Sequence, residues 1–96
     1  MKKSKLARKR VKRGIKLLRK NNKDWADDVS AKKLDMGYTG ICLLGQMFGC
    51  YSIGVSKLGV ELAPERYGFD RSGKIGYKRL NRTWKAAIRK ERKKAA

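Results

Sequence analysis

Apolar residues recur at steps of three and four in two segments, one near each end of the chain. In the first segment, the apolar or small positions that keep this step are Ala7, Val11, Gly14, Ile15 and Leu18. Lys and Arg fill most of the positions between them. This spacing places the apolar side chains on one face of a helix, and it predicts a helix from Ser4 to Lys20.

The second segment follows Asp70-Arg71-Ser72-Gly73, a run of residues typical of a turn. Its inward positions are Tyr77, Leu80, Trp84, Ala87, Ile88 and Glu91. The same step therefore predicts a second amphipathic helix near the C-terminal end. We expect Trp84 to anchor the core together with Trp25.

The middle of the chain is less regular. Asp24 or Asp28 can cap a short helical piece over residues 25–29, and Ser30 can begin another that runs to Leu34. Pro64 suits the first turn of a further short helix. No segment alternates with a period of two.

Residues 36–56 carry no charge. Thr39 is a suitable N-cap for a helix in this region, and Gly59 is a suitable stop. The inward positions would be Ile41, Leu44, Phe48, Val55 and Leu58, and the glycines at 45, 49 and 54 can divide the helix in two. A membrane span is the alternative, but nine of the 21 residues are Gly, Thr, Ser or Gln. That composition favours a buried core helix.

These patterns predict an all-α fold, a small bundle of four to five helices. We expect one helical domain, 1–96, made of a basic N-terminal helix (1–23), a helical core (24–70) and a basic C-terminal helix (71–96).

The charges are segregated along the chain. Residues 1–23 hold twelve Lys/Arg and no acid, residues 71–96 hold eleven against the single Glu91, and residues 24–70 hold seven acids against four bases. Positive charges that are concentrated in one segment repel each other, and a bound polyanion would neutralise them. We therefore expect DNA or RNA as the partner, bound through phosphates without base reading. The candidate nucleic-acid-binding residues are Lys9, Arg10, Lys12, Arg13, Lys16, Arg19, Lys20, Lys78, Arg79, Arg82, Lys85 and Arg89.

Two other interpretations of the basic helices stay open. Their faces can simply be solvated, or they can be partly neutralised by acids of the same chain, namely Asp24, Asp27, Asp28 and Asp35. In a different class of function, the chain would be a protein-interaction module for a host or phage protein, with an apolar helical surface around residues 36–62.

A helix-turn-helix over residues 41–60 is a further possibility. In it, Gly45 is the small residue of the first helix and Gly49 is the turn glycine, while Ser52, Ser56 and Lys57 face the DNA. The second helix lacks the Arg, Gln or Asn side chains that read base edges, which favours a core hairpin instead.

An enzyme is not expected, because the chain has no His to act as a base at neutral pH. Cys42 and Cys50 lack the spacing and the companions of a metal site, and they indicate reduced thiols that have a structural role. We expect no cofactor and no small-molecule substrate. The basic start lacks the apolar segment of a signal peptide, so a cytoplasmic location is expected.

Several short segments carry a resemblance to known sequences. They are Leu34-Asp35, the run from Cys42 to Gly49 with Tyr51, Leu58-Gly59-Val60, Tyr67-Gly68-Phe69-Asp70, and Leu80 with Trp84. Over about residues 15–88 the chain resembles a group of small uncharacterised, all-helical proteins encoded by bacteriophages of actinobacteria. The resemblance implies a phage-encoded helical protein that acts in the cytoplasm of the infected cell, and it supplies no catalytic residues. The basic segments 1–23 and 71–96 of this chain differ from that group in their positive charge.

Overall fold

The computed structural model describes residues 2–95, which form helices and no strands. The elements in chain order are α1 (Lys3–Asn21), the 3₁₀ helix η1 (Trp25–Asp28), α2 (Leu43–Phe48), α3 (Tyr51–Leu58), the 3₁₀ helix η2 (Pro64–Tyr67) and α4 (Tyr77–Ala95). The prediction of a small all-α bundle is therefore confirmed. The two predicted amphipathic helices are α1 and α4, each of 19 residues.

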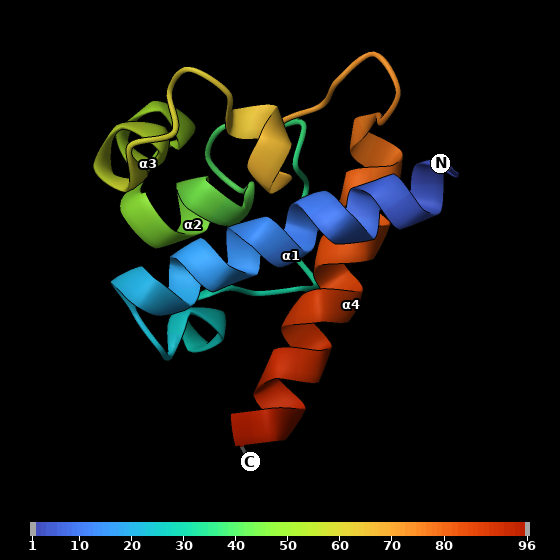
Figure 1. Ribbon diagram of the computed structural model, residues 1–96. Coiled ribbons are helices and arrows are strands. Elements are labelled where there is room, and N and C mark those ends of the chain that lie inside the picture. Colours follow the sequence, from blue (N-terminus) through green and yellow to red (C-terminus); the bar gives the residue numbers. More distant parts are fainter. Residues whose placement is uncertain (1, 96) are drawn as a thin grey trace.

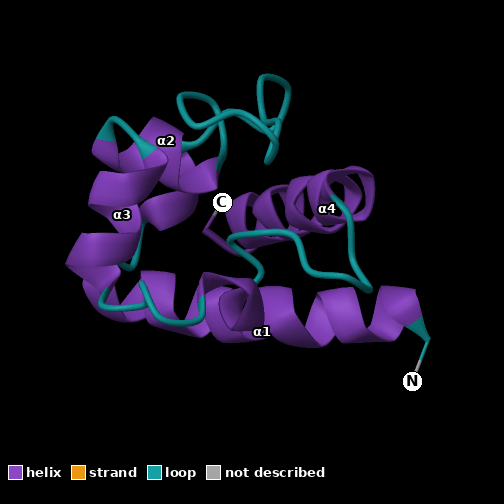
Figure 2. Cartoon of the chain, turned by 90° about the horizontal axis from the view of Figure 1, so that it is seen from above, coloured by secondary structure: helices purple, strands orange, loops and turns teal. Residues whose placement is uncertain are grey.

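Helices α1 and α4 pack directly against each other. Figure 1 shows α1 crossing in front of α4, with the C-terminal ends of the two helices diverging, and the view from above in Figure 2 shows α4 lying alongside α1. The predicted apolar stripes face the core: Ala7, Val11, Gly14 and Leu18 on α1 and Leu80, Trp84 and Ile88 on α4 are buried. The 3₁₀ helices η1 and η2 also pack on α1, and the stripe of α1 that meets Trp84 of α4 meets the backbone of η2 as well.

Two tryptophans form the centre of the core, as predicted. Trp25 and Trp84 are both fully buried, and their rings meet edge to face with centroids 6.1 Å apart. Phe69 stacks on Trp84 at 5.8 Å. The Trp84 indole N–H donates to the backbone oxygen of Gly68 at 2.6 Å, so this buried polar atom is satisfied.

The close packing of η2 on α1 explains a glycine inside the apolar stripe of α1. A Cβ at Gly14 would lie 2.2 Å from the backbone oxygen of Tyr67 and 3.1 Å from the Trp84 ring. Glycine therefore allows the backbone of η2 to approach the helix. Gly68 follows η2 with φ of 75°, a left-handed conformation that favours glycine.

The uncharged region over residues 36–56 forms loops and two short helices. Gly49 has φ of 96° and separates α2 from α3, and Gly59 ends α3 in a left-handed conformation, as predicted. The N-cap prediction was wrong. The cap of α2 is Cys42, whose sulfur accepts from the Gly45 N–H at 3.2 Å, whereas the Thr39 carbonyl bonds to the Tyr51 N–H. The inward position predicted for Ile41 was also wrong, because it precedes the helix and is 41% exposed.

The helix predicted from Ser30 to Leu34 does not form; residues 31–33 make a turn instead. The reason is that the backbone of Ser30 bonds to a side chain. Gln46 accepts from the Ser30 N–H at 2.7 Å and donates to its carbonyl at 3.2 Å. The Ser30 hydroxyl accepts from the Lys33 N–H and closes the turn.

The predicted short helix over residues 25–29 is η1, which begins after Asp24 without a side-chain cap. The short helix predicted at Pro64 is η2, with Pro64 in its first turn. Across residues 2–95, no helix has both the length and the apolar character that a membrane crossing needs.

Candidate nucleic-acid interface

A groove of about 810 Å³ lies between α1 and α4. Eight of the residues that line it are basic, and Glu91 is the only acid among them. The lining residues are Ser4, Arg8, Val11, Lys12, Ile15, Lys16 and Arg19 from α1, and Arg79, Arg82, Thr83, Ala86, Ala87, Lys90, Glu91 and Lys94 from α4. The groove thus joins the two basic segments, which are far apart in sequence, into one site.

Cations form the two walls of the groove. Arg8, Lys12 and Lys16 follow one another every four residues along α1, a step of about 6 Å. On α4, Arg82 lies two turns before Lys90, and Lys94 follows one turn later. These six side chains belong to exposed residues, and the described part of the chain offers none of them a hydrogen-bond or ion-pair partner. Phosphates could therefore reach all six.

The floor of the groove is uncharged. Ile15 of α1 and Thr83 and Ala87 of α4 line the groove between the cations and are half-buried. Ala86 is exposed and lies in the same row of α4 as Arg82 and Lys90, so it belongs to the wall. The groove therefore offers apolar surface between two cationic walls.

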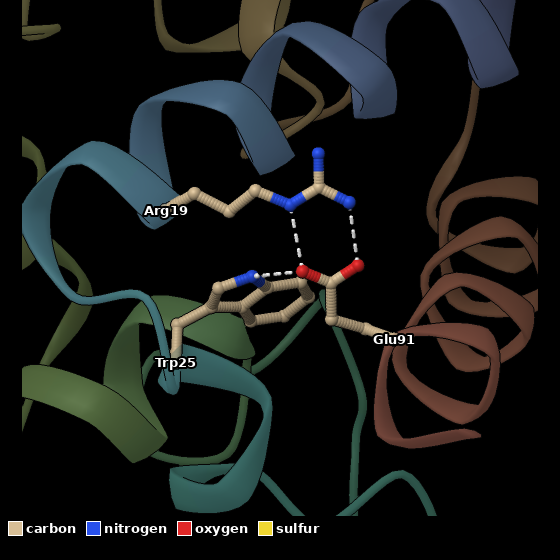
Figure 3. Close-up of polar contacts among 3 residues, drawn as sticks. All are labelled: Arg19, Trp25 and Glu91. Carbon is tan, nitrogen blue, oxygen red and sulfur yellow. Dashed lines mark hydrogen bonds and ion pairs between the residues drawn. The ribbon is translucent and has the colours of Figure 1, made fainter. Parts of the chain in front are cut away.

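An ion pair lies in the groove, toward the C-terminal ends of the two helices (Figure 3). Arg19 donates from Nε and Nη2 to the two carboxylate oxygens of Glu91, at 2.7 and 2.6 Å. The Trp25 indole N–H donates to the same carboxylate at 3.3 Å. These bonds to Arg19 hold the pKa of Glu91 below its usual value and raise the pKa of Arg19. The Glu91 side chain is 15% exposed, and that of Arg19 is 47% exposed.

A smaller hollow of about 210 Å³ continues the basic surface at the N-terminal end of α4. It is lined by Lys3, Lys74, Gly76, Lys78, Arg79 and Arg82. Arg79 and Arg82 line both the groove and the hollow, and Arg79 also donates to the Ser4 hydroxyl of α1. The groove and the hollow thus meet at Arg79 and Arg82 and form one basic track along α4.

The structure places the twelve candidate residues in different surroundings. Five of them line the groove: Lys12, Lys16, Arg19, Arg79 and Arg82. Lys78 lines the smaller hollow. Six lie outside both: Lys9, Arg10, Arg13, Lys20, Lys85 and Arg89.

Two of the outside residues make contacts within the fold. Arg10 donates to the Ser72 hydroxyl at 2.8 Å, and Arg13 reaches the backbone oxygen of Arg66 at 3.5 Å. Arg92 of α4 is used in the same way, since it donates to the backbone oxygens of Ala26 and Val29. Part of the positive charge therefore holds the fold together.

Sequence reasoning missed Arg8, Lys90 and Lys94 as members of the site. The spacing of these residues along the helices could have indicated that they belong to the site. Arg8 lies one turn before Lys12, and Lys90 lies two turns after Arg82, so each extends a row of cations on one helix face. What the sequence did not show is which cationic row of α1 faces which row of α4.

The acids of the central segment do not neutralise the basic helices through ion pairs. Within residues 2–95 the Arg19–Glu91 contact is the one ion pair. Asp28 accepts from the Asn22 amide, and Asp35 accepts from the Gly37 N–H and the Asn81 amide. Asp24 precedes η1 and Asp27 lies within it, and both are exposed.

The helix-turn-helix residues form a short hairpin, α2 and α3, in which Gly49 makes the turn as expected. The role expected of Gly45 was wrong. A Cβ there would lie 2.2 Å from the backbone oxygen of Thr39, so Gly45 admits a loop rather than the second helix. The close approach of the two helices occurs at Gly54, where a Cβ would lie 2.7 Å from that of Leu44.

Comparison with known protein families, with curated proteins and with solved structures finds no match for this chain.

Proposed function

We propose that this is a nucleic-acid-binding protein that binds phosphates in the groove between α1 and α4. The observation that carries the proposal is the set of six exposed cations on the two walls, which have no partner within residues 2–95. Each phosphate that such a cation neutralises releases condensed counterions, which favours binding without reading any base. The resemblance to phage-encoded proteins adds the proposal that the protein acts in the cytoplasm of an infected cell.

The charge balance supports a polyanion as the partner. The formal net charge is +19, and the groove has one carboxylate among eight basic side chains. That carboxylate is already paired with Arg19. A complex that uses the six free cations would have a log-affinity against log-salt slope of about −4 to −5, at ~0.7–0.9 per phosphate.

A salt titration with charge-matched variants tests the proposal. The groove variant replaces Arg8, Lys12, Arg82 and Lys90 with Gln, and the control variant replaces Lys9, Lys20, Lys57 and Arg89, which lie outside the groove, with Gln. Both variants lose four charges. We expect the groove variant to flatten the slope by roughly 3–4 units and the control to flatten it by less than one. If both variants flatten the slope equally, the phosphates do not bind at one defined set of cations.

A second candidate function is the protein-interaction module. Four large apolar side chains are exposed within residues 36–62: Tyr38 at 64%, Ile41 at 41%, Ile53 at 47% and Leu62 at 101%. A partner that covers them would bind with little dependence on salt. Failure of the intact chain to bind DNA or RNA at low salt would favour this candidate.

A further inference from the structure

The cationic walls and the apolar floor together indicate which class of nucleic acid the groove binds. We infer that its ligand is a single strand, with phosphates along the walls and bases against Ile15 and Ala87. This inference rests on the proposed function and adds the class of nucleic acid to it. Proteins that bind single strands combine a basic groove that follows the backbone with side chains on which the bases stack, usually aromatic ones. In this groove, aliphatic surface takes the place of the aromatic side chains.

A duplex fits this groove less well. Its phosphates and sugars lie on its outside. If the backbone of a duplex entered the groove between α1 and α4, its phosphates would lie over the aliphatic floor. Burying a charge against apolar surface is costly. In addition, the elements that read a duplex are convex and enter its grooves, whereas this site is recessed between two helices. A single strand can turn its bases toward the floor and its phosphates toward the cations.

The length of the track sets the size of the ligand. The basic surface runs along α4 from Lys78 in the smaller hollow to Lys94 at the far end of the groove. Sixteen residues of helix rise about 24 Å. At ~3.4 Å per phosphate of a helically stacked strand, this length accommodates about seven nucleotides. An extended strand would cover it with fewer.

The inference is tested with three DNA probes of twelve residues: a single strand, the duplex of the same sequence, and a single strand of abasic sites. The abasic strand keeps the phosphates and lacks the bases. At equal salt we expect the single strand to bind roughly tenfold more tightly than either of the others. Tenfold corresponds to about 1.4 kcal/mol, which burial of roughly 60 Å² of apolar surface supplies.

A floor variant supports the same test. Ala87→Gln places a neutral polar side chain on the floor with little change in helix propensity, and Ala63→Gln, at another half-buried alanine outside the groove, is the matched control. Ala87→Gln should reduce the preference for the single strand over the abasic strand to less than threefold and leave the salt slope unchanged. The control should retain the full preference.

The other outcomes separate the two proposals. If duplex and abasic strand bind as tightly as the single strand, the groove holds phosphates alone; the inference is then wrong and the proposed function stands. If poly-L-glutamate of matched charge binds more tightly than the single strand and competes for the groove, the ligand is an acidic polypeptide and the inference is wrong. If neither the DNA probes nor an RNA strand of the same sequence binds at low salt, the proposed function itself fails.

Discussion

Glu91 is the only acid in the groove, and its replacement by Gln should change binding and stability in opposite directions. The carboxylate uses two of the three nitrogens of the Arg19 guanidinium, so Arg19 is not free for a phosphate. Gln keeps the shape of the side chain and an oxygen that can accept from the Trp25 indole. The substitution therefore removes a negative charge and frees a positive one without opening the core.

The effect on binding follows from one added phosphate contact. A charge pair at 4 Å in water is worth about 1 kcal/mol, so affinity for a single strand at low salt should rise roughly fivefold. The log-affinity against log-salt slope should steepen by about 0.7–0.9.

The effect on stability follows from the lost ion pair. The Arg19 side chain is 47% exposed, so we assign the pair about 0.5–1 kcal/mol. In a chain of this size, that loss lowers the unfolding midpoint by about 2–8 °C. The pKa of Glu91 is depressed in the folded state, so the stabilisation is present above pH 4.5 and is lost as the pH falls through the lower folded pKa. The difference between wild type and variant should accordingly shrink in acid.

Fluorescence anisotropy with a labelled single strand over a series of salt concentrations measures the effect on binding. Thermal unfolding followed by circular dichroism measures the effect on stability. Glu65→Gln is the matched control, because it removes the same charge from η2, outside the groove. If Glu91→Gln binds no more tightly than Glu65→Gln, Arg19 does not reach the ligand and the reasoning is refuted.

Trp84→Ala should lower the free energy of unfolding by about 3–5 kcal/mol, because it removes the ring on which Trp25 and Phe69 pack; denaturant unfolding measures this, and an unchanged midpoint would contradict it. Gly14→Ala should also destabilise the fold, by about 1–3 kcal/mol, because its Cβ meets the backbone of η2; a stability equal to wild type would show that η2 can move away. In a thiol titration near pH 8, Cys50 should react before Cys42, because the Ser52 hydroxyl lowers the pKa of Cys50 whereas burial raises that of Cys42; equal rates would contradict the burial of Cys42.

The long helices could be predicted because their patterns are local. A stripe such as Leu80, Trp84 and Ile88 repeats over several turns, and the helix can bury it in one way only. The middle of the chain offers no such repeat. Its structure depends on contacts between distant residues, such as Gln46 with the Ser30 backbone, and these override the local preference for a helix after Ser30.

The sequence could predict which helices carry the cations of the candidate site, but not which of those cations line the groove. Charge segregation indicates that α1 and α4 carry the cations, and it says nothing about which faces of the two helices meet. Arg8 and Lys90 lie in the groove, whereas Arg13 contacts η2, and this division follows from the way Trp84 and Gly14 pack α1 and α4 together. Packing of the core thus selects which of many basic residues form the site.

The most direct test of the groove as the binding site is amide chemical-shift mapping by NMR while a short single strand is added to the intact chain. We expect the largest shifts at residues along both walls and the floor, such as Lys12, Ile15, Arg82 and Ala86, with little change at Ser52 and Lys57 of α3. Shifts centred on α3 or on the exposed apolar residues of 36–62, with the groove unchanged, would contradict the account.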